Sequence, residues 1–221
     1  MHQTVQNLLN INTQIKAKIN ELKYNNYKTE IIAISKTFSI SHILPLIDYG
    51  HIHFGENKVQ EAVLKWQDIK KDYGNIKLHL IGKLQTNKVK YVLPLFDYIH
   101  SLDSLKLAEK INLEQDKKKF KPKIFVQVNI GNEIQKNGVQ CEELEPFLKE
   151  CKKNLNLNII GLMCIPPNDD NTKIYFKKMY ELCKKFELPE LSMGMSGDYN
   201  LAVESGATFI RIGSKIFGDR I

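Results

Sequence analysis

Lys36 is the residue of this sequence whose type and position best suit covalent chemistry. It follows Ser35 and the apolar run Ile31–Ile34, a pattern typical of a strand buried on both faces. Apolar surroundings disfavour a charged ammonium, which lowers the pKa of the lysine and frees the amine to form a Schiff base. A lysine at a strand end can also extend its ammonium group into water. Lys36 alone does not decide between these two interpretations.

Small residues near the end of the sequence indicate a phosphate site. Ser196 follows Gly194 just before one expected helix, and Gly213 and Ser214 stand between an expected strand and another helix. Backbone N–H groups at helix N-termini bind phosphate where small residues allow a close approach. The same residues also begin helices that bind no ligand, so this pattern needs support from the fold.

Arg211 is conspicuous because only two of the 32 basic residues are arginines, at positions 211 and 220. A guanidinium stays protonated and presents its donors in a rigid plane, so an arginine at a strand end suggests that this shape is needed. A Schiff-base lysine, a phosphate site and an arginine facing one opening together describe a site for pyridoxal 5'-phosphate (PLP).

The elements that must position these residues alternate between short apolar runs and longer amphipathic segments. After a helix expected at residues 5–24, eight runs read as strands: Glu30–Ser35, His51–Phe54, Lys77–Ile81, Tyr98–His100, Lys123–Val128, Asn158–Cys164, Leu191–Met193 and Thr208–Ile212. Helices are expected near residues 40–49, 57–72, 86–93, 104–118, 141–153, 172–186, 198–205 and 214–218.

This α/β alternation predicts a single (β/α)8 TIM-like barrel over residues 1–221, with an extra N-terminal helix. Ligand chemistry in such barrels lies at the carboxyl ends of the strands. The rule brings Lys36, Asn57, Met163 and Arg211 to one opening, together with the loop that carries Ser196.

Composition excludes several classes of protein. The net charge is +7, but the lysines are scattered along amphipathic segments, so we expect solvated helix faces and no nucleic-acid partner. The N-terminus has no apolar signal segment and no run is long enough to span a bilayer, so we expect a cytoplasmic protein. The four cysteines lack metal-ligand spacing, which predicts free thiols and no metal.

Five other residues that could do chemistry have simpler interpretations. His51 and His53 are expected on one face of a strand without a third metal ligand, and His79 as a hydrogen-bonded barrel residue. Glu56 reads as an acid at a helix N-terminus rather than a general base. Lys136 is a candidate second acceptor for PLP, with a solvated loop lysine as the favoured alternative.

Taken together, the motifs resemble the YggS/PROSC family of PLP homeostasis proteins over roughly residues 5–220. The resemblance rests on the order and spacing of several segments: Ala33–Thr37, Phe54–Asn57 with Gln60 and Glu61, Ile81 and Gly82 with Leu84–Lys88, Val128 and Asn129 with Lys136 and Gly138, Gly161–Met163, Leu191–Ser196 with Asp198, Gly206–Thr208, and Arg211–Gly213 with Phe217, Gly218 and Arg220.

The resemblance implies a barrel similar to that of alanine racemase, with PLP held as an internal aldimine on Lys36. It assigns the phosphate contacts to Ser196, Gly213 and Ser214, and the pyridine nitrogen to Arg211. It places Asn57 and Met163 along the same opening. Lys58 and Lys83 depart from the tyrosine and histidine that many members have there.

An arginine at the pyridine nitrogen favours its unprotonated form, which weakens the ring as an electron sink and argues against transamination. Racemisation needs an acid or base on each face of the substrate, and Lys36 supplies one. The sequence ends at Ile221, just after the last expected helix, so we expect no second domain and a monomer. We therefore expect a non-catalytic protein of vitamin B6 homeostasis that supplies PLP to apoenzymes. The alternatives are a weak PLP-dependent amino-acid racemase and a phosphate-binding barrel enzyme without PLP.

Overall fold

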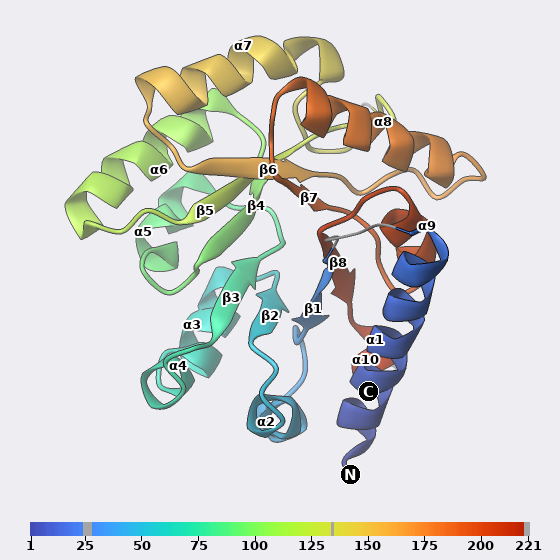
Figure 1. The fold of residues 1–221 in the computed structure, drawn as a ribbon. Coiled ribbons are helices and arrows are strands. Elements are labelled where there is room, and N and C mark those ends of the chain that lie inside the picture. The colour runs from blue at the N-terminus through green and yellow to red at the C-terminus, as the bar shows by residue number, and fades with distance from the viewer. Residues whose placement is uncertain (24–27, 134, 219–221) are drawn as a thin grey trace.

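Eight parallel strands close into a barrel at the centre of the computed structural model, which describes residues 1–23, 28–133 and 135–218 (Figure 1). Each strand pairs with the next, and the last pairs with the first. The strands are β1 (Glu30–Ile34), β2 (His53–Glu56), β3 (Lys77–Leu80), β4 (Tyr98–Leu102), β5 (Lys123–Gln127), β6 (Ile159–Met163), β7 (Glu190–Ser192) and β8 (Phe209–Ile212). All eight expected strands and the barrel itself are confirmed.

Helices lie between successive strands and cover the outside of the barrel (Figure 1). They are α1 (Gln3–Glu21), α2 (Ile40–Asp48), α3 (Val59–Trp66), α4 (Ile69–Asp72), α5 (Val89–Val92), α6 (Leu105–Lys118), α7 (Leu144–Lys149), α8 (Thr172–Lys185), α9 (Tyr199–Glu204) and α10 (Ser214–Phe217). The segment expected as one helix at 57–72 is two helices. That at 141–153 comprises a 3-10 turn η2 (Cys141–Glu143), α7 and a π-helical turn η3 (Glu150–Asn154).

The side chains of β1 pack alternately into two hydrophobic cores, one between the barrel and the helices and one inside the barrel. Ile31 and Ala33 pack outward against the helices, whereas Ile32 and Ile34 point into the barrel. Because successive strand residues point to opposite faces, an unbroken apolar run fills both cores at once. The interior cluster consists of Ile32, Ile34, Tyr98, Phe125, Met163 and Phe209.

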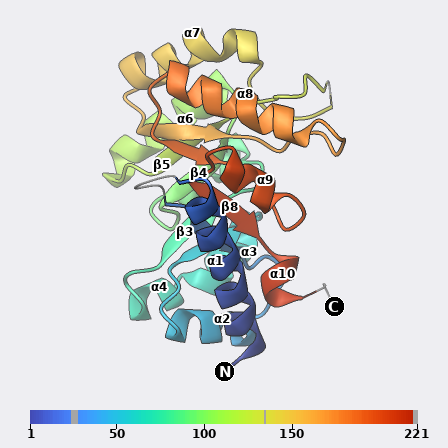
Figure 2. The ribbon, with the colours of Figure 1, turned by 45° about the vertical axis from the view of Figure 1, so that its right-hand side comes forward.

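Helix α1 packs along α9 and α10, the helices that follow the last two strands (Figure 2). Its buried face is built from Val5, Leu8, Ile11 and Ile15, at the three-to-four spacing of an amphipathic helix. The Asn7 amide donates to the Ile216 carbonyl at 3.0 Å, and the Tyr199 hydroxyl donates to Gln14. The extra N-terminal helix thus supports the two segments expected to bind phosphate.

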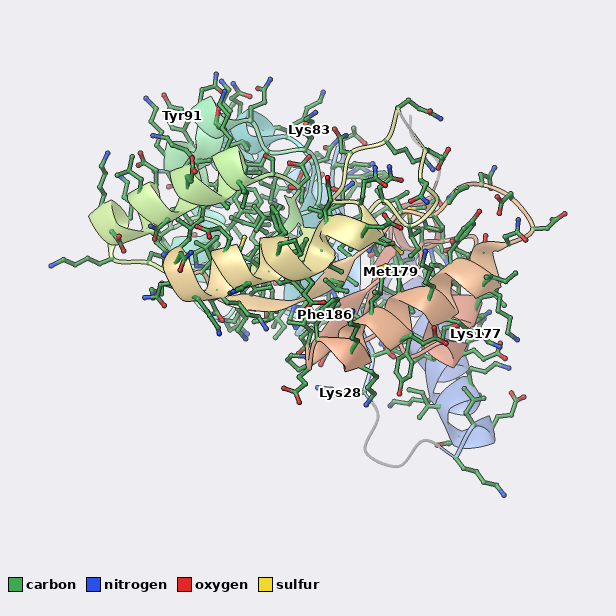
Figure 3. The ribbon with its side chains drawn as sticks, turned by 90° about the horizontal axis from the view of Figure 1, so that it is seen from above. Lys28, Lys83, Tyr91, Lys177, Met179 and Phe186 are labelled. Atoms are coloured by element: carbon green, nitrogen blue, oxygen red, sulfur yellow. The ribbon has the colours of Figure 1, made fainter. Side chains whose placement is uncertain are left out.

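Lysines lie mainly on the outer faces of the helices. On α8, Lys177 is exposed while Met179 is buried against the barrel, and Figure 3 shows both side chains from above. This is the arrangement of a solvated helix face. None of the described helices combines the length and apolarity needed to cross a membrane.

Candidate functional site

A cavity of about 720 Å³ opens at the carboxyl ends of the strands, where β1 and β8 meet. Its walls are Ile34, Lys36, Phe38, Asn57, Ile81, Gly82, Ile165, Met195, Ser196, Gly197, Arg211, Gly213, Ser214 and Gly218. Six of the seven residues expected at the site therefore lie along one cavity. The seventh, Met163, is 1% exposed inside the barrel and is not among the lining residues.

Lys36 stands in a tight turn that directly follows β1. The Ser35 hydroxyl donates to Glu56 at 2.7 Å, and the Thr37 N–H donates to Glu61 at 3.0 Å. Thr37 has φ of +69°, a left-handed conformation that is unusual for a β-branched residue. Both neighbours of Lys36 are thus fixed by carboxylates, which directs the lysine toward the cavity that it lines.

The carboxylate of Glu56 is fully buried beneath this turn. Its Oε1 accepts hydrogen bonds from the Lys65 ammonium and the Trp66 indole N–H, both at 3.0 Å. Lys65 also donates to the Ser35 carbonyl at 3.0 Å. Glu56 ends β2, so the expectation of an acid at a helix N-terminus is wrong. It does not line the cavity. It is a structural support for the Lys36 turn.

Asn57 follows β2 and presents a side-chain carbonyl in the cavity wall. Its Oδ1 is buried and has no hydrogen-bond partner within the described part of the chain. An unsatisfied buried acceptor is costly in an empty protein, so such an atom is typical of a site that binds a polar ligand. The backbone of Asn57 is held close to Gly82 of the next loop.

Replacing Gly82 by alanine is expected to destabilise the fold by about 1–3 kcal/mol, because overpacking forces the backbone to move. A Cβ at this position would lie 2.2 Å from the Asn57 carbonyl oxygen. Chemical denaturation of the variant measures the change in free energy of unfolding. Gly74→Ala is the matched control, since nothing lies within 4 Å of a Cβ there. Equal stability of the two variants would contradict the close approach.

The loops after β7 and β8 form the opposite wall. Gly194 has φ of +90°, and a Cβ there would lie 2.5 Å from the Ala202 side chain, so glycine is required where the chain turns into α9. The Asp198 carboxylate accepts from the Met195 N–H at 2.6 Å and fixes the loop that carries Ser196 and Gly197.

Gly213 and Ser214 face the same space from the start of α10. The first N–H groups of a helix have no acceptor within it. Small residues on both loops therefore expose backbone donors and hydroxyl groups to an anion in the cavity.

Arg211 lies on β8 at the base of the cavity and is 5% exposed. One terminal nitrogen donates to the Ser192 hydroxyl at 2.8 Å and the other to the Cys164 carbonyl at 2.9 Å. Burial lowers the pKa of Arg211 below its ordinary value. Within the described ranges, no carboxylate forms an ion pair with it.

Three histidines continue this contact through the barrel interior, and with Ser192 we call them the histidine file. His100 Nδ1 lies 3.0 Å from the Ser192 hydroxyl, and His100 Nε2 lies 2.9 Å from His79 Nδ1. His79 Nε2 in turn lies 2.9 Å from His53 Nδ1. The expectation that His79 is a hydrogen-bonded barrel residue is confirmed. No local pattern indicates that it is one of three hydrogen-bonded histidines.

The histidine file is expected to make the fold sensitive to acid. Burial lowers the pKa of His53, His79 and His100 in the folded chain, below the 6.5 of an ordinary histidine. Burial likewise lowers the pKa of His51 to about 4. As the pH falls below the pKa that these histidines have in the unfolded chain, the unfolded chain binds protons before the folded chain does. The contribution of the histidines to stability is therefore complete above that pKa and is lost as the pH falls below it.

Each of these histidines adds a slope of up to about 1.4 kcal/mol per pH unit between its unfolded and folded pKa values. Urea denaturation between about pH 7 and pH 5 measures the total slope. The exposed His42→Gln variant is the control, and it should keep the slope, whereas His100→Phe should reduce it. A stability that does not change over this range would contradict the expectation.

His51 and His53 do not share a face, contrary to the sequence interpretation. His51 packs edge-on against Phe54 of the outer core, whereas His53 points into the barrel against His79. The rings diverge because β2 begins only at His53 and does not include His51.

Two further residues singled out in the sequence lie away from the cavity or outside the described ranges. Lys136 forms an ion pair with Glu133 at 2.5 Å and donates to the Pro166 carbonyl at 3.1 Å, and it does not line the cavity. Arg220 lies outside the described residues.

Few side chains that could take part in a reaction line the cavity within the described ranges. Among its described lining residues, Lys36 and Arg211 alone carry a basic side chain, and the guanidinium of Arg211 stays protonated. No tyrosine, histidine or carboxylate lines it within the described ranges. The arrangement can therefore hold an anion, a carbonyl compound and a polar ring, and it offers one amine for reaction.

Comparison with known proteins agrees with this geometry. The alanine racemase N-terminal domain family matches residues 12–221. The pyridoxal phosphate homeostasis protein of Aquifex aeolicus is 38% identical over 200 residues, covering 86% of this chain and 87% of the relative. That of Haemophilus influenzae is 36% identical and covers 97% and 94%.

A solved structure shares the fold over nearly the same length. PipY of Synechococcus elongatus, determined with PLP bound, superposes with a TM-score of 0.77 at 34% identity, covering 92% of this chain and all of PipY. The chain therefore belongs to the alanine racemase N-terminal domain family and, within it, to the pyridoxal phosphate homeostasis proteins, the YggS/PROSC family.

Proposed function

We propose that this chain binds PLP in the cavity at the carboxyl ends of its strands, through a Schiff base with Lys36. The observation that carries the proposal is the meeting of three groups in one cavity: the Lys36 amine, the small-residue loops at Ser196 and Gly213, and the buried Arg211. The PLP-bound relative and the names of the homeostasis proteins support the same ligand.

The residues present fit each part of PLP. Ser196, Gly213 and Ser214 would hold the phosphate, and Arg211 would donate to the pyridine nitrogen. The unsatisfied Asn57 Oδ1 offers an acceptor to a polar group of the ligand. Lys36 would form a C=N bond to the aldehyde carbon, while the aldehyde oxygen leaves as water.

The lining residues favour a carrier over a catalyst. Bound PLP supplies an electron sink for amino-acid chemistry, but an arginine at the pyridine nitrogen keeps that nitrogen unprotonated and the sink weak. Racemisation also needs a second acid or base beyond Lys36, and no described lining residue provides one. We therefore propose that the protein holds PLP for intracellular vitamin B6 homeostasis and supplies it to apoenzymes.

Cysteine chemistry is consistent with a cytoplasmic setting for this role. The four cysteines are free, and burial raises the pKa of Cys151, Cys164 and Cys183 to about 12. Unpaired thiols are typical of a reducing compartment.

Borohydride reduction of the PLP-loaded protein tests the attachment site, because it converts the C=N bond into a stable secondary amine. Peptide mass spectrometry should then find the pyridoxyl group on Lys36. An adduct found on Lys136 instead, or spread over the exposed lysines, would overturn the assignment.

Chiral analysis after incubation with L-alanine tests the carrier role, since D-alanine formed at an enzymatic rate would show a racemase.

A further inference from the structure

Arg211 carries a positive charge into the barrel interior, and among the described residues no carboxylate forms an ion pair with it. Moving an ion into a medium of low dielectric constant costs several kcal/mol unless dipoles or a counter-ion compensate it. Its guanidinium donates hydrogen bonds to the Ser192 hydroxyl and the Cys164 carbonyl, both neutral. The histidine file begins at Ser192, so the dipoles of its imidazole rings act on the Arg211 charge.

We propose that the histidine file is a neutral hydrogen-bond chain with a single direction, which compensates and orients the Arg211 guanidinium. Ser192 and His100 are then positioning residues for the cofactor site. The donor-to-acceptor direction of these hydrogen bonds follows from contacts within the protein alone. Its role in holding a ligand rests on the proposed PLP function.

The direction follows from counting donors and acceptors. Arg211 can only donate, so the Ser192 oxygen accepts, and its own proton is available for His100 Nδ1. A neutral His100 that accepts at Nδ1 carries its proton on Nε2 and donates to His79 Nδ1. By the same rule His79 donates from Nε2 to His53 Nδ1. All three rings are therefore Nε2–H tautomers.

The reverse direction is electrostatically and structurally worse. It would make His100 donate to Ser192, whose hydroxyl proton would then need another acceptor, and no described side chain provides one. It would also turn the positive end of each imidazole dipole toward the guanidinium. In the proposed direction the negative end of every dipole faces the cation, and successive hydrogen bonds strengthen one another.

Ring packing leaves the histidines little freedom to change. His100 stacks on Phe125 with centroids 4.3 Å apart, and His79 stacks on Tyr98 at 4.1 Å. Both histidines are fully buried. A ring flip would break two hydrogen bonds in a packed interior, so the file fixes the position of the Ser192 hydroxyl and hence of the guanidinium.

Nitrogen-15 NMR of the imidazole rings, recorded on the protein without PLP near pH 7, tests the direction. His79 and His100 should appear as neutral Nε2–H tautomers. An Nδ1–H tautomer or an imidazolium at His100 would overturn the proposal, whether or not the protein binds PLP. Tautomers as expected in a protein that does not bind PLP would instead contradict only the proposed function.

The matched pair Ser192→Ala and Ser192→Thr tests the positioning role. Loss of the hydroxyl removes a hydrogen bond to a charged group, so Ser192→Ala should weaken PLP binding about tenfold or more. It should also raise the Nδ1–H population of His100. Ser192→Thr restores the hydroxyl and should return both readouts toward the original values. If Ser192→Ala lowers stability but changes neither the tautomer nor the affinity, the role is merely structural and the proposal fails.

Discussion

Replacement of Lys36 by alanine is expected to abolish the visible absorption of the PLP-loaded protein and the adduct trapped by borohydride. Both signals need a C=N bond to an amine, and Lys36 supplies the only lysine amine among the described lining residues of the cavity. The residue is half-buried in a turn after β1, so truncation removes the amine without emptying the core. Absorption spectra during titration with PLP measure the loss.

Two control variants sharpen this result. Lys177→Ala removes an exposed lysine of α8 and should leave the spectrum unchanged. Lys136→Ala removes the candidate second acceptor, which is paired with Glu133. A spectrum that survives in Lys36→Ala but disappears in Lys136→Ala would reverse the assignment of the two lysines.

Replacement of Lys65 by alanine is expected to cost about 3–5 kcal/mol in the free energy of unfolding, because it leaves the buried Glu56 carboxylate without its counter-ion. The Glu56 side chain is 0% exposed and that of Lys65 12%, with 3.0 Å between the charged atoms. Lys65 also holds the Ser35 carbonyl, so the variant should loosen the turn that presents Lys36. Urea denaturation without PLP measures the stability change.

The ion pair of Lys71 with Asp68 is the control, because both side chains are exposed and their atoms lie 2.8 Å apart. Lys71→Ala should cost less than about 1 kcal/mol. The double variant Glu56→Gln with Lys65→Met removes both charges and should recover much of the stability lost in Lys65→Ala. A cost for Lys65→Ala as small as that for Lys71→Ala would show that the buried pair contributes little.

The barrel was predictable because each strand can be recognised from its local pattern of apolar residues. Ile31–Ile34 is apolar at every position, as a strand buried on both faces requires, and amphipathic segments separate it from similar runs. Once the barrel is expected, the position of Lys36 follows from the rule that ligands bind at the carboxyl ends. Six of the seven expected residues line one cavity at those ends.

Met163 lies at the carboxyl end of a strand and yet does not line the cavity, so the rule fails for this residue. It is the last residue of β6, one position before the end of the expected strand, and its side chain packs with Phe125 and Phe209 in the interior cluster. Distance along the barrel axis decides whether an inward residue reaches the opening, and this depends on the stagger between strands. No local pattern in the sequence encodes that stagger.

The support beneath Lys36 and the histidine file were missed for a related reason. Lys65 reaches Ser35 across 30 positions of the sequence, and His100 reaches Ser192 across 92. His53, His79 and His100 come from neighbouring strands, and only the register of those strands brings their rings into line. Each histidine taken singly is typical of an ordinary core residue.

The filled barrel interior also governs how molecules move in and out of the cavity. Phe125, Met163 and Phe209 are each at most 5% exposed, and they occupy the barrel below the cavity together with the buried rings of His79 and His100. Within the described residues, these side chains fill the barrel axis below the cavity. A ligand of the cavity therefore exchanges with solvent at the carboxyl ends of the strands. Under the proposed role in PLP supply, a recipient bound over this opening would block reloading of the cavity, so transfer and reloading would alternate.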